Sequence, residues 1–310
     1  MRILVTGGAG FIASHIVDAY IKDGHEVIII DNLSTGKKDF INKKARFYKI
    51  DIRNRRELEL VLKKEKPSVI NHHAAQISVR HSVENPFFDL EINLIGLLNL
   101  IQLGKKAGLK KMIFASSGGV VYGEADTIPT PENYVPLKPQ SPYGITKLSS
   151  EYYLDYFFQN YRIPYIALRY SNVYGPRQNP HGEAGVIAIF TSKLLRGETS
   201  IINGDGLQTR DYVYVKDVVE ANRKALISDK VGAFNIGTSR ETNVLEIFNR
   251  LRKLIGKNTT VSHGSAKKGE QKRSCLNCNL ALKVLGWKAE STLNQGLKKT
   301  VEYFQQNEKV

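Results

Sequence analysis

Two short apolar runs, joined by a glycine turn and an amphipathic stretch, open the chain and restrict its fold more than any other feature. Arg2 to Thr6 (RILVT) precedes the turn GGAGFIA, and a second run, Val27 to Ile30, ends in Asp31. Strand, glycine turn, helix, strand and acid in this order place backbone N–H groups and a helix N-terminus against a pyrophosphate. The acid is then positioned for adenosine ribose hydroxyls and would repel a 2′-phosphate, which favours NAD over NADP. A plain tight turn is the alternative interpretation.

Apolar and helical segments continue to alternate beyond this unit. Strands are expected at Arg46–Ile50, Ser68–His72 and 113–117, and helices at Arg55–Lys64 and Phe87–Lys106. This alternation predicts an α/β chain with a Rossmann-type, doubly wound parallel sheet, whose ligands lie at the carboxyl ends of the strands. Several residues that could bind a ligand or take part in catalysis follow expected strands in this way: Gly10, Asp31, Asp51, Ala75 and Ser117. The alternation loosens later in the chain. We therefore expect an NAD-binding domain over residues 1–171 and about 213–240, and a smaller α/β substrate-binding domain over 172–212 and 241–310.

A Tyr-x-x-x-Lys pair, Tyr143 and Lys147, follows an expected strand that ends in Ser116 and Ser117. Positions i and i+4 of a helix share a face, so the phenol and the ammonium project the same way. A cation beside a phenol lowers the phenol's pKa from about 10. Tyr143 is therefore expected to accept a proton from an alcohol near neutral pH, with the Ser117 hydroxyl holding the same alcohol.

The net charge of +15 raises the question of nucleic-acid binding. Basic residues are spread along the chain in short pairs such as Lys37–Lys38, without arginine–aromatic blocks or zinc-finger spacing. A lysine-rich surface and a small anionic substrate are therefore favoured over a nucleic-acid partner. No apolar run approaches 18 residues and no signal-peptide pattern occurs, so a cytoplasmic protein without a membrane partner is expected.

Two pairs of potential metal ligands are present, but no metal is expected at either. His72 and His73 are neighbours on a strand and would point to opposite faces. Cys275-x-x-Cys278 lacks a second ligand pair and a thioredoxin-like context. Structural cysteines are the expected interpretation.

Eight segments occur in an order that is similar to that of a known family: TGGAGFIAS, DNLSTG, HAAQ, FASSGGVVYG, SPYGITK, LRYSNVYGPRQNPHGEAGVIAIF, TRDYVYVKDV and FNIGTS. Over nearly its whole length the chain resembles the extended short-chain dehydrogenase/reductase family, and most closely its NAD-dependent UDP-glucose (UDP-galactose) 4-epimerases. The resemblance implies that tightly held NAD takes a hydride from C4 of a UDP-hexose while Tyr143 removes the 4-hydroxyl proton. A 4-keto intermediate would turn over in the site, and the hydride would return to its other face.

The resemblance also implies which residues form the site. The catalytic residues would be Ser117, Tyr143 and Lys147. The residues that would contact NAD are Gly7, Gly10, Phe11, Ile12, Asp31, Asn32, Ser34, Gly36, Asp51, Ile52, Ala74, Ala75, Gln76, Asn93, Ser116, Tyr143, Lys147 and Tyr170. The residues that would contact the UDP-sugar are Ser117, Asn172, Val186, Arg210, Arg273 and Ser274. For Asn93, a satisfied core amide or a polar anchor behind the site is an equally open interpretation.

Some substrate-side expectations rest on short segments. A guanidinium matches phosphate bidentately, which suits Arg210 to a diphosphate; an ion pair with Asp211 or Asp217 is the alternative. By resemblance, HGEAGVI (181–187) would close over the nucleotide. The segment KKGEQKRS (267–274) departs from the family, whose members usually carry arginine and proline before the glycine–acid pair. The small Ser274 would leave room at C2 of the sugar for an N-acetyl group.

The residues after Ser117 discriminate between members of the family. Gly118 and Gly119 come next, and no carboxylate appears before Glu124. Relatives that dehydrate or decarboxylate the keto intermediate need an acid–base group there, so epimerisation is favoured. A UDP-glucuronate 4-epimerase, a dTDP-glucose 4,6-dehydratase and a non-catalytic dinucleotide-binding regulator remain as alternatives. By resemblance, the aromatic stretch YYLDYFF (152–158) would pair with the helix at 94–101 of a second copy in a homodimer; an all-core helix is the alternative.

Overall fold

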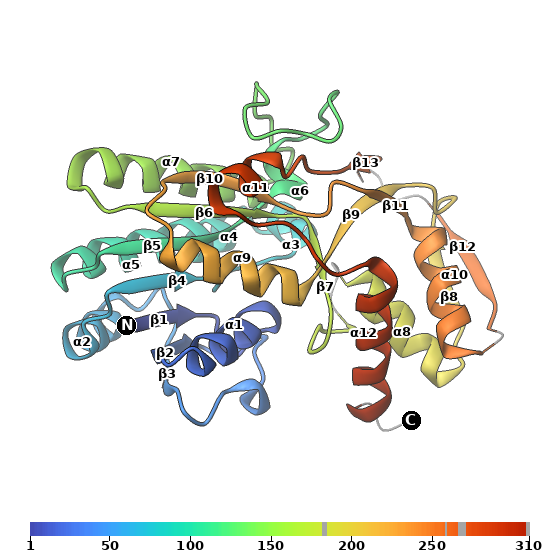
Figure 1. Ribbon diagram of the computed structural model, residues 1–310, viewed down its shortest axis with the longest axis horizontal. Helices are drawn as coiled ribbons and strands as arrows, with labels where there is room; N and C mark the ends of the chain where they lie inside the picture. Colours follow the sequence, from blue (N-terminus) through green and yellow to red (C-terminus); the bar gives the residue numbers. More distant parts are fainter. Residues whose placement is uncertain (182–184, 258, 266–270, 308–310) are drawn as a thin grey trace.

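A seven-stranded parallel sheet forms the centre of the computed structural model, which describes residues 1–181, 185–257, 259–265 and 271–307 (Figure 1). Its strands are β1 (Arg2–Thr6), β2 (Glu26–Asp31), β3 (Arg46–Lys49), β4 (Val69–His72), β5 (Lys111–Ser117), β6 (Tyr165–Tyr170) and β10 (Gly232–Ile236). They lie in the order β10-β6-β5-β4-β1-β2-β3, and every neighbouring pair is parallel. The direction of strand addition reverses between β1 and β4. This order confirms the predicted doubly wound α/β fold.

The inner strands are continuously apolar because helices cover both faces of the sheet. Ile3, Leu4 and Val5 in β1 are fully buried, as is the run Ile28–Ile30 in β2. The strands predicted from the apolar runs after residues 45 and 67 are observed as β3 and β4, each within one residue of the expected bounds.

Five long helices pack on this sheet. They are α1 (Phe11–Lys22), α2 (Arg55–Glu65), α5 (Gly96–Lys106), α7 (Pro142–Tyr161) and α9 (Val215–Ile227). Helices α1 and α9 share one core, which includes Val17 and Val218, whereas α2, α5 and α7 share the core on the other face, which includes Leu100 and Leu154. The shorter helices are a 3-10 turn (Lys38–Phe40), α3 (Val79–Glu84), α6 (Gly118–Val121) and α11 (Asn279–Leu285).

The helix predicted at Phe87–Lys106 is observed, with an irregularity near its start. Asn85 caps α4 (Pro86–Leu90) by accepting the N–H of Phe88 at 3.1 Å, and a π-helical turn (Glu91–Ile95) leads into α5. Among the helices of the described residues, the segment Pro86–Lys106 alone is long and apolar enough to cross a membrane. Half of its most apolar window is buried inside the protein.

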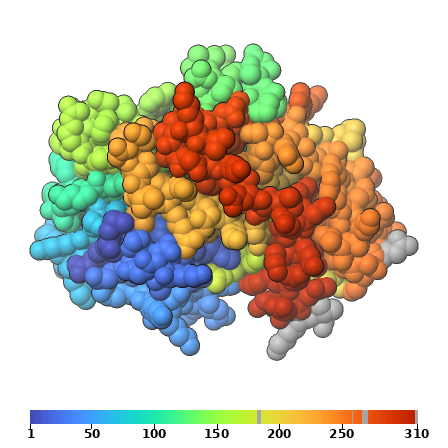
Figure 2. Space-filling model, in the orientation of Figure 1, coloured from blue at the N-terminus to red at the C-terminus, as the bar shows by residue number. Residues whose placement is uncertain are grey.

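A second lobe stands beside the carboxyl ends of the strands, at the right of Figure 1. Its strands are β7 (Asn172–Tyr174), β8 (Ser200–Asn203), β9 (Thr209–Tyr214), β11 (Glu241–Asn243), β12 (Val261–Gly264) and β13 (Arg273–Ser274), and its helices are α8 (Val186–Arg196), α10 (Val244–Ile255) and α12 (Leu293–Asn307). Phe190 and Phe248 pack edge to face in its core, with ring centroids 5.5 Å apart. Figure 2 shows the red C-terminal segment crossing from the first lobe to the second.

Candidate active site

A cavity of about 1040 Å³ lies between the carboxyl ends of the parallel strands and the second lobe. Most residues that the sequence singled out line it, although they come from distant parts of the chain. They are Gly7, Gly10, Phe11, Ile12, Asp31, Asn32, Ser34, Asp51, Ile52, Ala74, Ala75, Ser116, Ser117, Tyr143, Lys147, Tyr170, Asn172, Val186, Arg210 and Ser274. The cavity is therefore the candidate active site.

The glycine turn at one end of the cavity packs against the loop after β4 too closely for a side chain at Gly7. Gly7 has φ +69°, and a β-carbon on it would lie 2.8 Å from the backbone nitrogen of Ala74. The Gly10 N–H donates to the Gly7 carbonyl at 2.9 Å, which closes the turn. No side chain caps α1, so its first N–H groups are available to an anion. These features fit the pyrophosphate of a dinucleotide.

Asp31, at the end of β2, braces this turn as well as facing the cavity. Its Oδ2 accepts the Ala9 N–H at 3.0 Å and its Oδ1 accepts the Leu33 N–H at 2.8 Å. Gly36 was predicted to contact the cofactor, but it does not line the cavity; a β-carbon there would lie 3.0 Å from the Asp31 carboxylate oxygens. Gly36 instead lets the loop after β2 pass close behind Asp31.

Asp51, after β3, is already engaged by protein groups. The hydrogen bonds from Arg53 are the largest cause that lowers the pKa of Asp51, to about 2, and Asn32 Nδ2 donates to the same carboxylate at 3.0 Å. Asp51 is therefore a fixed anion in the cavity wall.

The catalytic candidates meet where β5 ends beside α7. Ser141 caps α7 by accepting the Gly144 N–H at 3.2 Å, which starts the helix just before Tyr143. Lys147 is 4% exposed, and its Nζ donates to the Ala115 carbonyl at 2.8 Å and lies 5.7 Å from the centroid of the Tyr143 ring. Ser117 hydrogen-bonds the Tyr143 phenol. One helix and one strand therefore hold the hydroxyl, the phenol and the ammonium together.

The predicted lowering of the Tyr143 pKa is wrong for the protein by itself. Burial raises the pKa of Tyr143 to about 12, although the hydrogen bond with Ser117 acts in the opposite direction. Burial also lowers the pKa of Lys147 to about 8, against the attraction of Asp89 and Glu151. The sequence pattern places the two groups correctly but does not show how completely they are withdrawn from water. This desolvation changes their pKa values more than the two groups change each other's.

Four predicted site residues do not line the cavity: Gly36, Gln76, Asn93 and Arg273. Asn93 is 2% exposed; its Nδ2 donates to the Gln76 carbonyl at 3.0 Å and its Oδ1 accepts the Gln76 N–H at 2.9 Å. Gln76 Nε2 in turn donates to Asp89 at 2.8 Å. Both side chains therefore lie behind the cavity wall, and their contact with the cofactor stays a prediction; the hydrogen bonds of Asn93 fit either a satisfied core amide or a polar anchor behind the site.

Arg273, predicted to contact the UDP-sugar, also lies outside the cavity wall. Its side chain is 59% exposed and forms an ion pair with Glu241 at 2.5 Å. Arg210 does line the cavity, and its Nη1 donates to the Thr209 carbonyl at 2.7 Å. The Asp211 carboxylate, an alternative partner for Arg210, is held by Thr238 through two hydrogen bonds. Residues 182–184 of the expected closing segment and 267–270 of the departing segment lie outside the described residues.

The two histidines after β4 contact different residues. His72 Nδ1 lies 2.7 Å from the Thr6 hydroxyl, and His73 Nε2 lies 3.0 Å from the Tyr170 hydroxyl. Cys275 and Cys278 are free thiols. Burial raises the pKa of both, to about 12 for Cys278, so neither has the character of a reactive thiolate.

Sequence reasoning missed several polar residues of the cavity wall. They are Arg80, Glu124, Gln140, Asn203, Gln208 and Gln271. Arg80 lies on the short helix α3, whose six residues give too little periodicity to identify a face. Gln271 Nε2 donates to the Gly123 carbonyl at 2.7 Å, a contact between segments far apart in sequence that has no local signal.

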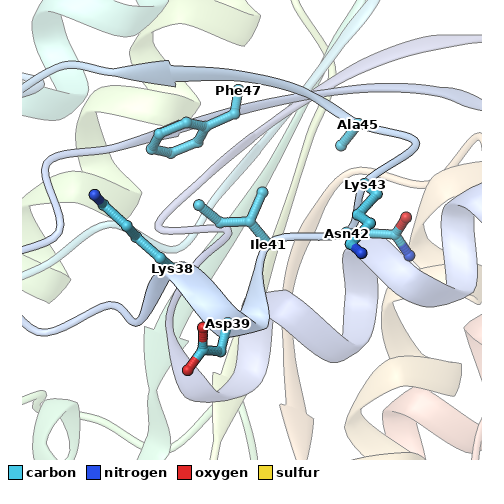
Figure 3. A pocket seen from close by; sticks show the side chains of 7 residues that line it. All are labelled: Lys38, Asp39, Ile41, Asn42, Lys43, Ala45 and Phe47. Carbon is cyan, nitrogen blue, oxygen red and sulfur yellow. The ribbon is translucent and has the colours of Figure 1, made fainter.

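A second, shallower hollow of about 540 Å³ lies beside the loop between β2 and β3. Figure 3 shows Ile41 and Phe47 facing one another there, with Lys38 and Lys43 at the sides and Asp39 directed away. None of the Ser, Tyr and Lys candidates lines it, so the chemistry is assigned to the larger cavity.

Comparisons with known proteins agree with this geometry. A family model described as the NAD dependent epimerase/dehydratase family matches residues 3–237. The putative UDP-glucose 4-epimerase of Methanocaldococcus jannaschii is 48% identical, over 98% of this chain and 99% of its own length. The crystal structure of Thermotoga maritima UDP-glucose 4-epimerase with UDP-glucose superposes with TM-score 0.97 at 47% identity, covering 99% of both chains. The Thermus thermophilus enzyme in complex with NAD gives TM-score 0.95 at 40% identity, over 99% of this chain and all of its own.

Proposed function

This chain belongs to the NAD dependent epimerase/dehydratase family, and from that premise we propose that it is an isomerase that interconverts UDP-galactose and UDP-glucose. The observation that carries the proposal is the convergence of Ser117, Tyr143 and Lys147 on one cavity whose other end is a glycine turn. A hydroxyl, a phenol and an ammonium beside a dinucleotide site suit reversible oxidation of a secondary alcohol.

The residues of the first lobe fit the cofactor. The Gly7–Gly10 turn and the N-terminus of α1 would hold the pyrophosphate, and the Asp31 carboxylate would receive the ribose hydroxyls. When bound, NAD supplies reversible hydride transfer at C4 of the sugar. We assign cofactor binding to residues 1–171 and about 213–240, and sugar-nucleotide binding to 172–212 and 241–310.

Three side chains would handle the proton of the 4-hydroxyl. Ser117 would orient the hydroxyl through a hydrogen bond, and Tyr143 would accept its proton and later return it. Lys147, held by the Ala115 carbonyl, would stabilise the negative charge that develops on the phenol oxygen. Arg210, which lines the second-lobe wall, would bind the diphosphate.

The surroundings of Ser117 favour epimerisation over elimination. Gly119 lines the cavity beside Ser117, and a glycine cannot move a proton. Glu124 also lines the cavity, so its carboxylate is the group that a dehydratase reaction would use here. We expect Glu124→Gln to retain C4 epimerisation; formation of a 4-keto-6-deoxy sugar by the unaltered protein, abolished in Glu124→Gln, would favour the dTDP-glucose 4,6-dehydratase alternative.

The test of the proposal is to incubate the purified protein with UDP-galactose, without added cofactor, and to separate the products. Conversion to UDP-glucose that is lost in Tyr143→Phe supports the proposal. Tyr161→Phe is the matched control, because this tyrosine is on the same helix but is 44% exposed. Failure to turn over UDP-galactose with NAD added would refute it, and UDP-glucuronate, UDP-N-acetylhexosamines and dTDP-glucose would then be tried.

A wider substrate range follows from Ser274. This small side chain lines the cavity, which leaves space for an N-acetyl group at C2. UDP-N-acetylglucosamine is therefore expected as a substrate, with Ser274→Tyr removing that activity while UDP-galactose turnover remains. No detectable turnover of the N-acetyl sugar by the unaltered protein would contradict this.

The active form is proposed to be a homodimer through α7 and the helical segment Pro86–Lys106, which contains residues 94–101. These helices pack together and expose large apolar side chains: Phe87 (79%), Tyr152 (63%) and Tyr156 (48%). This exposure contradicts the all-core interpretation of α7. Light scattering should give twice the mass of one chain, and Tyr152→Glu should halve it. Ile227→Glu, at a 76% exposed apolar residue at the end of α9, is the control.

A further inference from the structure

A buried ion pair lies one helical turn behind Lys147. Glu151 of α7 and Arg169 of β6 form a bidentate ion pair. Arg169 Nη2 donates to Glu151 Oε2 at 2.6 Å and Arg169 Nε donates to Oε1 at 3.0 Å. The two side chains are 7% and 6% exposed. Neither residue lines the cavity, so neither can touch substrate or cofactor directly.

The same carboxylate also reaches β5. Ser116 Oγ donates to Glu151 Oε1 at 2.5 Å, and Ser116 pairs with Arg169 in the register between β5 and β6. Ser116 precedes Ser117 directly. One carboxylate therefore fixes the strand that ends in the catalytic serine to the helix that carries Tyr143 and Lys147.

The network extends from Arg169 towards the substrate side. Arg169 Nη1 donates to the Tyr122 hydroxyl at 2.8 Å, and this hydroxyl donates to Asn235 Oδ1 at 2.7 Å. Asn235 Nδ2 donates to the Asn277 carbonyl at 3.0 Å, three residues beyond Ser274. A continuous chain of hydrogen bonds, buried except at its last, partly exposed link, thus joins the catalytic helix to the segment that follows Ser274.

We propose that Glu151 and Arg169 are positioning residues of the reaction: their ion pair fixes the end of β5 against α7 and keeps a carboxylate and its counter-charge one turn behind the Lys147 ammonium. This inference rests on the proposed function. The charge of Glu151 raises the pKa of Lys147, while burial lowers it to about 8. Arg169 carries the opposite charge to Glu151, so removing it is expected to change the Lys147 pKa in the opposite direction.

The other titratable groups around Lys147 are the same in both variants, so a change in the Lys147 pKa can be assigned to the Glu151–Arg169 pair. The Asp89 carboxylate on α4 raises the Lys147 pKa. His72 and His73 face Lys147 from the end of β4, and burial lowers the pKa of both, so they carry no charge at neutral pH. Tyr143 is neutral because its pKa is about 12.

The test compares the pH dependence of kcat/KM for UDP-galactose in Glu151→Gln and Arg169→Met. Glu151→Gln leaves an arginine charge without its carboxylate, so the alkaline limb should move to lower pH. Arg169→Met leaves the Glu151 carboxylate without its counter-charge, so the alkaline limb should move to higher pH. In both, kcat should fall about tenfold, while KM changes less than about threefold, since neither side chain lines the cavity.

Three further variants separate position from charge and from folding. Glu151→Asp keeps the charge but shortens the reach to Ser116, so kcat should fall with the alkaline limb unmoved. The double variant Glu151→Met, Arg169→Met removes both charges, and it replaces a single variant that does not fold. Glu246→Gln is the matched control: its ion pair with Arg250 has the same 2.6 Å separation, but the side chains are 41% and 39% exposed.

Titration of Lys147 by NMR, with ¹³C-labelled lysine in the NAD-bound protein, gives the same comparison without any substrate. Opposite displacements of the Lys147 pKa in the two single variants support the inference even if UDP-galactose is not the substrate. Displacements in the same direction, or none, overturn it, whatever the outcome for the proposed function. Wild-type turnover with no change of kcat in Glu151→Asp would overturn the positional part.

Discussion

Replacing Gly7 by alanine tests whether the glycine turn is shaped by its contact with the loop after β4. Gly7 has φ +69°, a backbone conformation that costs an L-residue about 1–2 kcal/mol. Its added β-carbon would lie 2.8 Å from the Ala74 nitrogen and 3.0 Å from the Ala74 Cα, and these backbone atoms cannot rotate away. Overpacking of this kind costs about 1–3 kcal/mol. Gly7→Ala should therefore lower the free energy of unfolding by about 2–5 kcal/mol.

Gly24→Ala is the matched control for this prediction. Gly24 has φ +83°, yet a β-carbon there would have no neighbour within 4 Å. The two variants share the strain of a positive φ and differ in the collision, so Gly24→Ala should lose only about 1–2 kcal/mol.

The assays are urea unfolding and titration with NAD. Gly7→Ala should bind NAD at least about tenfold more weakly, because relief of the collision displaces the N–H groups that face the pyrophosphate. Gly24→Ala should bind NAD as the unaltered protein does. Equal losses of stability in the two variants, or unchanged NAD affinity in Gly7→Ala, would refute the reasoning.

Three other perturbations have expected outcomes. A β-carbon on Gly96 would collide with Ile52, so Gly96→Ala should destabilise the protein by about 1–3 kcal/mol and weaken NAD binding, since Ile52 lines the cavity; urea unfolding and NAD titration check this. Phe248→Ala should lose about 3–5 kcal/mol in urea unfolding, because the ring is fully buried against Phe190. Because the folded pKa of Asp51 is lowered, its stabilising contribution is present above its unfolded pKa of about 3.9 and is lost as the pH falls towards about 2; Arg53→Met should flatten the acid-unfolding curve in that range.

Structural features that depend on local sequence patterns could be predicted, and they account for the fold and much of the cavity. The apolar runs of β1 and β2, with the glycine turn between them, fixed the order of elements without any tertiary information. The spacing of Tyr143 and Lys147 placed both on one face of α7. These features depend on residues near one another in the chain, where helix and strand periodicity operates.

Contacts between segments that are distant in sequence could not be predicted. Arg273 is predicted to contact the UDP-sugar, and its ion pair with Glu241, 32 residues away, has no local signal. The pair of Glu151 with Arg169 could not be expected, because it needs the register that sets Arg169 beside Ser116. Asn93 was ambiguous for the same reason: its amide is satisfied by Gln76 across a loop.

The error for Tyr143 has a chemical consequence. Bringing its pKa from about 12 to about 7 requires about 7 kcal/mol. One unit charge about 4 Å away contributes about 4 kcal/mol at the effective dielectric constant of such sites. A further positive charge near the phenol would therefore assist the Lys147 ammonium in lowering the Tyr143 pKa. An oxidised nicotinamide ring carries such a charge. Burial thus keeps the Tyr143 phenol protonated in the protein by itself, and an oxidised nicotinamide bound beside it would supply positive charge that favours the phenolate.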